Sequence, residues 1–124
     1  MTKILIVDDS ATMRKIIMRV LRQADLKVDE ILEAGNGVEG LKVMVNDPDI
    51  DMILSDVNMP EMNGIEFVKA VRTKHKKDSL PVVMITTEGG EAMVAKAIEA
   101  GANDYVTKPF TPDSIAAALG KFVG

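Results

Sequence analysis

The chain has 124 residues and a formal net charge of −4, a length that suits one compact domain around a single core. Apolar residues make up 47% and charged residues 27%, a balance typical of soluble globular proteins rather than disordered or membrane-spanning chains. Cysteine is absent, which excludes disulfides, thiolate metal sites and a cysteine nucleophile, and because no secretory signal or long apolar run is visible, we expect a cytoplasmic protein without a membrane segment.

Short apolar runs alternate five times with longer segments of helical periodicity. The runs that we interpret as strands are Ile4–Val7, Val28–Leu32, Met52–Leu54, Val82–Ile85 and Tyr105–Val106. The apolar stripes that we expect on helices are Met13, Ile16, Ile17, Val20, Leu21 and Ala24; Val38, Leu41 and Val45; Ile65, Val68 and Val71; Val94, Ala97 and Ile98; and Ile115, Ala118, Leu119 and Phe122. Nearly continuous apolar strands are typical of a parallel sheet covered on both faces. The pattern predicts one α/β domain over residues 1–124, a three-layer sandwich of five strand–helix units.

Capping and turn residues agree with these boundaries. We expect Ser10 to cap the first helix, Asn63-Gly64 to form a turn, and Gly101 to end a helix. Pro112 suits the first turn of the last helix.

The one basic run of the chain is Lys74-His75-Lys76-Lys77. Its simplest interpretation is a solvated helix end, where cations complement the helix dipole. Since the net charge is negative and no basic face dominates, we expect no nucleic-acid partner.

Polar residues stand where the predicted strands end. Asp8 and Asp9 close the first strand, Asp56 follows the third, Thr86 closes the fourth, and Lys108 follows the fifth. Ligands of open parallel sheets bind outside the carboxyl ends of the strands. Distant segments are therefore expected to deliver carboxylates, a hydroxyl and an ammonium to one edge of one sheet.

Taken singly, each of these residues has a simpler explanation. An aspartate before a helix is commonly an N-cap, Thr86 could satisfy nearby backbone groups, and Lys108 could be a surface lysine. The combination favours a site, because three crowded carboxylates repel one another unless cations join them.

The charge balance of this group indicates a divalent cation. Asp8, Asp9 and Asp56 supply three negative charges and Lys108 one positive charge, so a divalent ion would make the site neutral. Carboxylate ligands without histidine or cysteine favour Mg2+ over zinc. Mg2+, a lysine, a hydroxyl and a spare carboxylate are equipped for phosphoryl transfer through an aspartyl phosphate.

The residues closely resemble the receiver domain of two-component response regulators, in particular the chemotaxis (CheY-like) type. The matching stretches are Ile4-Leu5-Ile6-Val7-Asp8-Asp9-Ser10 with Thr12-Met13-Arg14; Asp56-Val57-Asn58-Met59-Pro60 with Asn63-Gly64; Pro81-Val82-Val83-Met84-Ile85-Thr86-Thr87-Glu88; Gly101-Ala102; and Tyr105-Val106-Thr107-Lys108-Pro109-Phe110. Together they span the chain. The resemblance implies a flavodoxin-like (βα)5 doubly wound parallel sheet with strand order 2-1-3-4-5.

The resemblance also implies roles for single residues. Asp56 is expected to be the phosphoacceptor, Asp9 a direct Mg2+ ligand and Asp8 its acidic companion. Asp56 and the backbone carbonyl of Asn58 would complete the protein's share of the metal shell, and Lys108 would contact the phosphoryl oxygens.

Thr86 and Tyr105 resemble the switch pair of the family. The threonine hydroxyl would turn toward the phosphoryl group and leave space for the aromatic ring, whereas the plainer interpretation of Tyr105 is an ordinary strand aromatic. The helix from about Glu91 to Ala100, with the strand that contains Tyr105, would form the output face.

The function expected from this resemblance is a single-domain switch without an attached output domain. It would not be an enzyme, but a signalling protein that catalyses its own phosphotransfer and autodephosphorylation. It would accept phosphate on Asp56 from a CheA-like sensor histidine kinase, act as a monomer, and signal by protein contacts, with a flagellar motor switch as the favoured target. The alternative within this class is a phosphorelay shuttle that passes phosphate to a histidine phosphotransfer protein.

Two other classes fit less well. A Mg2+-dependent aspartyl-phosphate phosphatase of the haloacid dehalogenase type needs a second carboxylate as acid/base, where this chain has Asp56-Val57-Asn58. A flavin-binding module would need a hydroxyl- and glycine-rich phosphate loop after the first strand, where Asp8-Asp9 would repel the phosphate.

Overall fold

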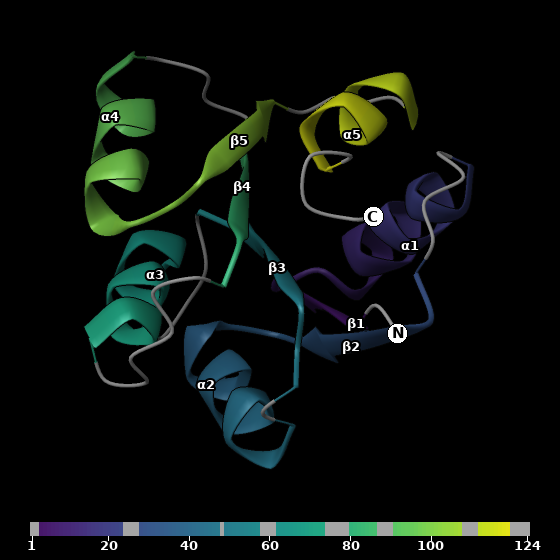
Figure 1. Cartoon of the computed structure of the whole chain (residues 1–124), viewed down its shortest axis with the longest axis horizontal. Coiled ribbons are helices and arrows are strands. Elements are labelled where there is room, and N and C mark those ends of the chain that lie inside the picture. The colour runs from purple at the N-terminus through teal and green to yellow at the C-terminus, as the bar shows by residue number, and fades with distance from the viewer. Residues whose placement is uncertain are drawn as a thin grey trace.

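The computed structural model describes residues 3–23, 28–47, 49–57, 62–73, 80–86, 91–107 and 112–119. Strands and helices alternate along the chain (Figure 1). They are β1 (Lys3–Val7), α1 (Ala11–Gln23), β2 (Glu30–Ala34), α2 (Gly37–Asn46), β3 (Met52–Asp56), α3 (Gly64–Thr73), β4 (Val82–Thr86), α4 (Glu91–Ala100), β5 (Asp104–Thr107) and α5 (Pro112–Leu119). Within the described ranges, no helix has the length and apolar character needed to cross a bilayer.

The five strands form one parallel sheet in the order β2-β1-β3-β4-β5. This confirms the predicted fold class and strand order. In the register between β1 and β3, Val7 pairs with Ser55. The next residues along the two strands are Asp8 and Asp56, so the pairing brings the two aspartates to the same level at the carboxyl edge of the sheet.

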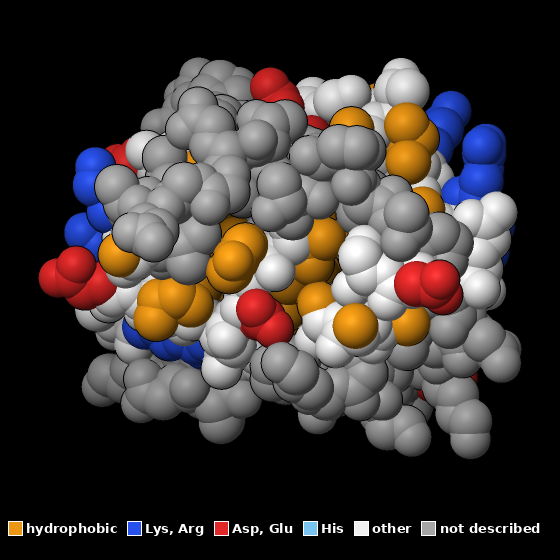
Figure 2. Space-filling view, turned by 90° about the horizontal axis from the view of Figure 1, so that it is seen from above, with side chains coloured by type: hydrophobic (Ala, Val, Ile, Leu, Met, Phe, Trp, Pro, Cys, Tyr) orange, Lys and Arg blue, Asp and Glu red, His pale blue; other side chains and the backbone are white. Residues whose placement is uncertain are grey.

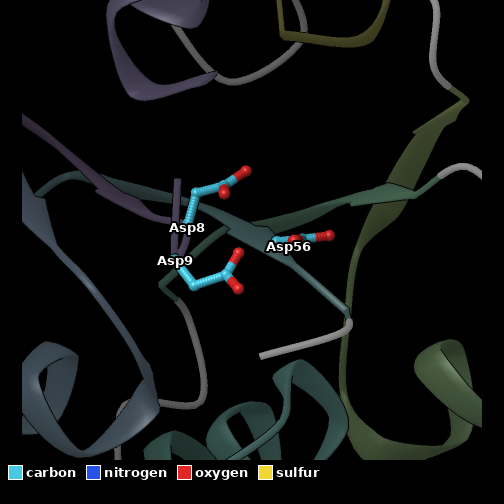
Figure 3. A group of neighbouring side chains, drawn as sticks. All are labelled: Asp8, Asp9 and Asp56. Carbon is cyan, nitrogen blue, oxygen red and sulfur yellow. The ribbon is translucent and has the colours of Figure 1, made fainter. Parts of the chain in front are cut away.

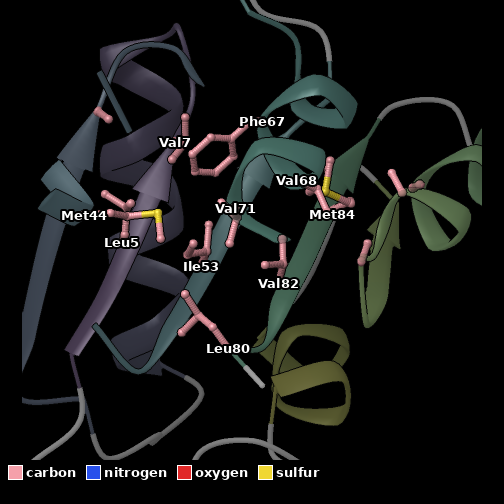
Figure 4. Packing of buried hydrophobic residues seen from close by; sticks show 14 of the residues in the cluster. Leu5, Val7, Met44, Ile53, Phe67, Val68, Val71, Leu80, Val82 and Met84 are labelled. Atoms are coloured by element: carbon pink, nitrogen blue, oxygen red, sulfur yellow. The ribbon is translucent and has the colours of Figure 1, made fainter. Parts of the chain in front are cut away.

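Helices cover both faces of the sheet: α1 and α5 lie on one face, and α2, α3 and α4 on the other (Figure 1). Because side chains alternate along a strand, Ile4 and Ile6 of β1 pack toward α1 and α5. Leu5 and Val7 pack toward α2 and α3, where Phe67 lies in the same cluster (Figure 4). All four of these β1 side chains are fully buried, as a strand covered on both faces requires.

Several predicted strand boundaries need correction, most of all that of the second strand. The second strand, expected at Val28–Leu32, pairs with β1 over Glu30–Ala34 instead. Val28 comes before the pairing begins, and it packs half-buried against the cluster under α1. Its apolar character reflects this packing rather than a place in the ladder. The third and fourth strands also extend further than predicted, so Asp56 is the last residue of β3.

The predicted apolar stripe of α2 is wrong: the buried side of the helix is shifted by one residue from the predicted one. Val38 and Val45 are exposed to 38% and 67%, and the buried residues of this helix are Gly37, Gly40 and Met44. Gly40 lies so close to the ring of Phe67 that an added Cβ would come within 2.9 Å of it. Glycine therefore occupies the buried side of the helix because little space is available there.

The other stripes are largely confirmed. The residues that are buried or half-buried as predicted are Met13, Ile17, Val20 and Leu21 in α1, Leu41 in α2, Ile65, Val68 and Val71 in α3, Ala97 in α4, and Ile115 and Ala118 in α5. Ile16 and Ile98 are exposed to 38% and 44%, contrary to the prediction. The side chains of Ala24, Val94, Leu119 and Phe122, and the basic run 74–77, lie outside the described residues.

The predicted caps are observed at three helices. The Oγ of Ser10 accepts a hydrogen bond from the backbone N–H of Met13 (3.2 Å), and Pro112 begins α5. Gly101 ends α4 with a positive φ of 120°, which glycine tolerates. Asn63 does more than turn the chain: its Oδ1 accepts a hydrogen bond from the N–H of Glu66, and its own N–H donates to that residue's carboxylate. This reciprocal pair begins α3.

An ion-pair cluster lies at the opposite, amino edge of the sheet. The ammonium of Lys3, at the start of β1, lies 2.6 Å from Asp47, 3.4 Å from Asp49 and 3.5 Å from Glu30. The side chain of Lys3 is only 8% exposed. Its hydrogen bond to Asp47 raises the pKa of Lys3 above its ordinary value, against the opposing effect of burial.

Candidate functional site

Three carboxylates meet at the carboxyl edge of the sheet. One oxygen from each of Asp8, Asp9 and Asp56 can be chosen so that all three lie within 4.8 Å of one another. Figure 3 shows the side chains gathered at the carboxyl ends of β1 and β3. Asp8 is buried, Asp56 half-buried and Asp9 exposed, so the group opens from the sheet toward solvent. We name it the acidic triad.

Hydrogen bonds fix Asp8 on several sides. Its backbone N–H donates to the carbonyl of Ala34 (3.1 Å), and its Oδ1 accepts from the N–H of Ser10 (2.9 Å). Its backbone carbonyl accepts a hydrogen bond from Nη1 of Arg14. Because a buried carboxylate needs such partners, the residues that follow β1 hold Asp8 in one position.

Asp56 is fixed by the turn that follows β3. Its Oδ1 accepts a hydrogen bond from the N–H of Val57 (2.8 Å). The carbonyl of Val57 accepts from the N–H of Gly64, the first residue of α3 (2.8 Å). The hydroxyl of Ser55, which is fully buried, donates to the carbonyl of Asp56 (2.9 Å). The start of α3 and the end of β3 therefore form one tightly packed unit.

The acidic triad fits a magnesium ion. Its donors are hard carboxylate oxygens from two adjacent strands, the ligand type that Mg2+ prefers. Three like charges at this spacing repel one another, and a divalent cation would offset that repulsion. Because Mg2+ usually keeps several waters, the exposed side of Asp9 is a suitable place for the remaining ligands.

The structure brings together only part of the predicted site within its described residues. Thr86 is the last residue of β4, at the same edge of the sheet, but its side chain is outside the described part. Asn58 and Lys108 also lie outside it. Tyr105 belongs to β5 and is 39% exposed.

Two residues that contact the backbone of the acidic triad were not predicted from the sequence to belong to the site. Arg14 reaches back from α1 to the carbonyl of Asp8, and Gly64 packs directly on the backbone of Asp56. A cation one turn into the helix after an acidic strand end could have indicated Arg14. Gly64 indicated only a turn in the sequence, because the residue type alone does not show that two backbone segments approach each other closely.

Comparison with known proteins agrees with this architecture. Residues 4–120 match the family model described as the response regulator receiver domain. The chain is 46% identical over 122 residues to a chemotaxis protein CheY homolog of Campylobacter jejuni, an alignment that covers 98% of this chain and 92% of that protein. It is 44% identical to chemotaxis protein CheY1 of Helicobacter pylori, with 98% and 97% covered.

A solved structure gives the same result. The fold is similar to that of chemotaxis protein CheY4 of Vibrio cholerae, with a TM-score of 0.87, 36% sequence identity and 99% of each chain covered. The family match, the full-length relatives and the fold agree, and the chain therefore belongs to the response regulator receiver domain family, as a CheY-like member.

Proposed function

We propose that this protein is a phosphorylation-dependent chemotaxis switch that accepts a phosphoryl group on Asp56 with Mg2+ as cofactor. The observation that carries the proposal is the acidic triad, in which Asp56 lies beside two further carboxylates at the end of β3. The CheY relatives support the chemotaxis role. A sensor histidine kinase would be the donor, and a flagellar motor switch component the target.

Each residue of the site has a proposed part in phosphotransfer. Asp8, Asp9, Asp56 and the backbone carbonyl of Asn58 would hold Mg2+, which supplies positive charge for the phosphoryl oxygens. An oxygen of the Asp56 carboxylate attacks the phosphorus of a phosphohistidine, and the P–N bond breaks with its electron pair leaving on the imidazole. The hydrogen bond from the N–H of Val57 to Oδ1 of Asp56 orients the carboxylate for this attack.

Lys108 and Thr86 would respond to the new phosphoryl group. The Lys108 ammonium would contact its oxygens, and the Thr86 hydroxyl, at the end of β4, would turn toward it. Tyr105 would then pack into the space that Thr86 leaves. This gives the two-state element through which a local charge can bias a distant surface.

The face formed by α4 and β5 would be the output surface. Figure 2 looks onto this face and shows hydrophobic side chains gathered near its centre. Ile98 of α4 and Tyr105 of β5 are among the exposed large hydrophobic residues. Exposed apolar groups of this kind, bordered by polar ones, are suited to a protein partner.

Phosphorylation with a small donor tests the proposal. Acetyl phosphate plus Mg2+ should add one phosphoryl group to the wild-type protein and none to Asp56→Asn, measured by intact-protein mass spectrometry. Asp113→Asn, which changes an exposed aspartate of α5, should be labelled like the wild type. Labelling of Asp56→Asn would overturn the assignment of the acceptor.

The output is tested separately. Thr86→Ala should be labelled but should lose the phosphorylation-dependent gain in binding to a flagellar motor switch component. Transfer from phospho-Asp56 to a histidine phosphotransfer protein, without motor binding, would instead identify a phosphorelay shuttle. Sustained turnover of a phosphomonoester would favour the phosphatase.

A further inference from the structure

Arg14 of α1 contacts one residue of the acidic triad, Asp8, and one residue of β2, Glu33. Its Nη1 donates a hydrogen bond to the backbone carbonyl of Asp8, and its Nε donates to Oε1 of Glu33 on β2 (3.0 Å). The Arg14 side chain is only 19% exposed, whereas the Glu33 side chain is 44% exposed. The guanidinium is thus anchored at two points, by the residue that follows β1 and by a residue of β2.

The carbonyl that Arg14 holds belongs to the peptide group that joins Asp8 to Asp9. The other side of Asp8 is fixed as well, because its N–H donates to Ala34 and its carboxylate accepts from Ser10. The orientation of this peptide plane sets the position of the Asp9 Cα atom, from which the side chain extends. Asp9 itself is exposed, so the backbone behind it has a large share in directing its carboxylate.

We propose that Arg14 is a positioning residue for the metal: it fixes the Asp8–Asp9 peptide so that both carboxylates face Asp56 before a cation binds. The inference rests on the proposed function, in which the acidic triad holds Mg2+. Glu33 directs the guanidinium, and Arg14 directs the peptide. Groups that orient metal ligands typically change the affinity for the metal by about 10- to 100-fold when they are replaced.

The charge of Arg14 alone would have the opposite effect. A cation near the acidic triad repels Mg2+, so removal of its charge, with no other change, would tighten Mg2+ binding. Positioning predicts weaker binding. The direction of the change therefore separates the two roles.

Arg14→Lys is the decisive variant, because it keeps the charge but cannot hold both Asp8 and Glu33 with a planar fork. We expect its dissociation constant for Mg2+, measured by isothermal titration calorimetry, to rise about tenfold. Amide NMR shifts of the metal-free protein would show whether the Asp8–Asp9 peptide has moved. Arg14→Met should also bind more weakly, to a smaller extent, because the lost repulsion partly offsets the lost positioning. Arg19→Met is the matched control: Arg19 lies on the same helix and is exposed, and its replacement should not weaken binding.

Two results would overturn the inference while the proposed function stands. One is wild-type affinity, within about twofold, for Arg14→Lys; the other is tighter Mg2+ binding by Arg14→Met. Thermal unfolding of the metal-free variants shows whether each is folded, and Arg14→Lys suffices if Arg14→Met does not fold. A wild-type protein that binds no Mg2+ at millimolar concentrations would overturn the proposed function and this inference together.

Discussion

The first residue of α3, Gly64, packs against the backbone carbonyl of Asp56. A Cβ added at Gly64 would lie well inside 3.0 Å of that oxygen, and also 2.7 Å from Cε of Met84 and 2.9 Å from Cα of Val57. The helix start can approach the strand end this closely only because the residue has no side chain. The position of the proposed phosphoacceptor thus depends on a glycine eight residues further along the chain.

Gly64→Ala should therefore destabilise the protein and disturb Asp56. The rigid backbone of β3 cannot yield to the new methyl group, and we expect a loss of at least about 2 kcal/mol in the free energy of unfolding. Urea denaturation would measure it. Gly35→Ala is the matched control, since the nearest neighbours of its Cβ would be the flexible side-chain ends of Glu39, at 2.7 Å, and Arg14, at 4.0 Å. Equal costs for the two variants would contradict the argument.

Neutralising one member of the acidic triad should have opposite effects with and without metal. Asp9→Asn removes like-charge repulsion, so at low salt the metal-free protein should gain on the order of 1 kcal/mol in stability. The wild type should gain about 1.4 kcal/mol at a Mg2+ concentration ten times its dissociation constant, and the variant should lose most of this gain. Unfolding curves with Mg2+ and with EDTA test both parts. If Asp9→Asn were stabilised by Mg2+ as strongly as the wild type, Asp9 would not be a ligand.

Arg72 ties the end of α3 to the connection between α4 and β5. Its guanidinium donates hydrogen bonds to the carbonyls of Leu80 (2.6 Å) and Gly101 (2.8 Å) and to Oδ1 of Asn103 (2.9 Å). Arg72→Met should remove these three hydrogen bonds, although Oδ1 of Asn103 keeps the one from the N–H of Val82, and should cost about 1–3 kcal/mol. We expect faster amide exchange at Asn103 in particular.

Arg22→Met provides the comparison for this variant. Arg22 is exposed in the last turn of α1, where replacement should cost less than about 1 kcal/mol. A similar loss of stability for both arginine variants would mean that the hydrogen bonds of Arg72 have no special weight.

The ion-pair cluster at the amino edge predicts a pH dependence. A hydrogen bond from its own backbone N–H and the ammonium of Lys3 lower the pKa of Asp49 below its ordinary value of 3.8. The unfolded chain then binds more protons near pH 4 than the folded one, so this stabilisation is present above that range and is lost as the pH falls. The raised pKa of Lys3 keeps its own contribution intact up to its ordinary value of 10.5.

Lys3→Met should abolish this pattern. At neutral pH the variant leaves Asp47, Asp49 and Glu30 to repel one another, and its midpoint of thermal unfolding should be several degrees lower than that of the wild type. The difference should shrink as the pH falls to 3.8, the ordinary pKa of Asp49, and below, because that carboxylate then takes up a proton. A difference that stays constant across this range would show that packing of the lysine stem, rather than its charge, stabilises the sheet edge.

The sequence predicted the fold and the acidic triad because both follow from simple rules. Apolar runs covered on both faces indicate a parallel sheet, and the carboxyl ends of such strands share one edge, which places Asp8 beside Asp56. The rotation of α2 could not be predicted in this way. A prediction based on the apolar residues Val38 and Val45 does not include Gly37 and Gly40. These glycines are buried because they pack against Met62 and Phe67, respectively. The role of Arg14 could not be predicted for a similar reason, since its partners are the backbone carbonyl of Asp8 and a side chain of β2.

The place of β1 in the sheet has a consequence for synthesis on the ribosome. This strand is made first, yet it is flanked by β2 and β3, so its second neighbour is not complete until Asp56 has left the exit tunnel. Until then, the run Ile4–Val7, which is fully buried in the finished protein, has one edge open to other chains. Short apolar segments with an unpaired edge are prone to aggregate. A nascent chain of this protein should therefore be an early client of ribosome-bound chaperones, and should lose that need once β3 has emerged.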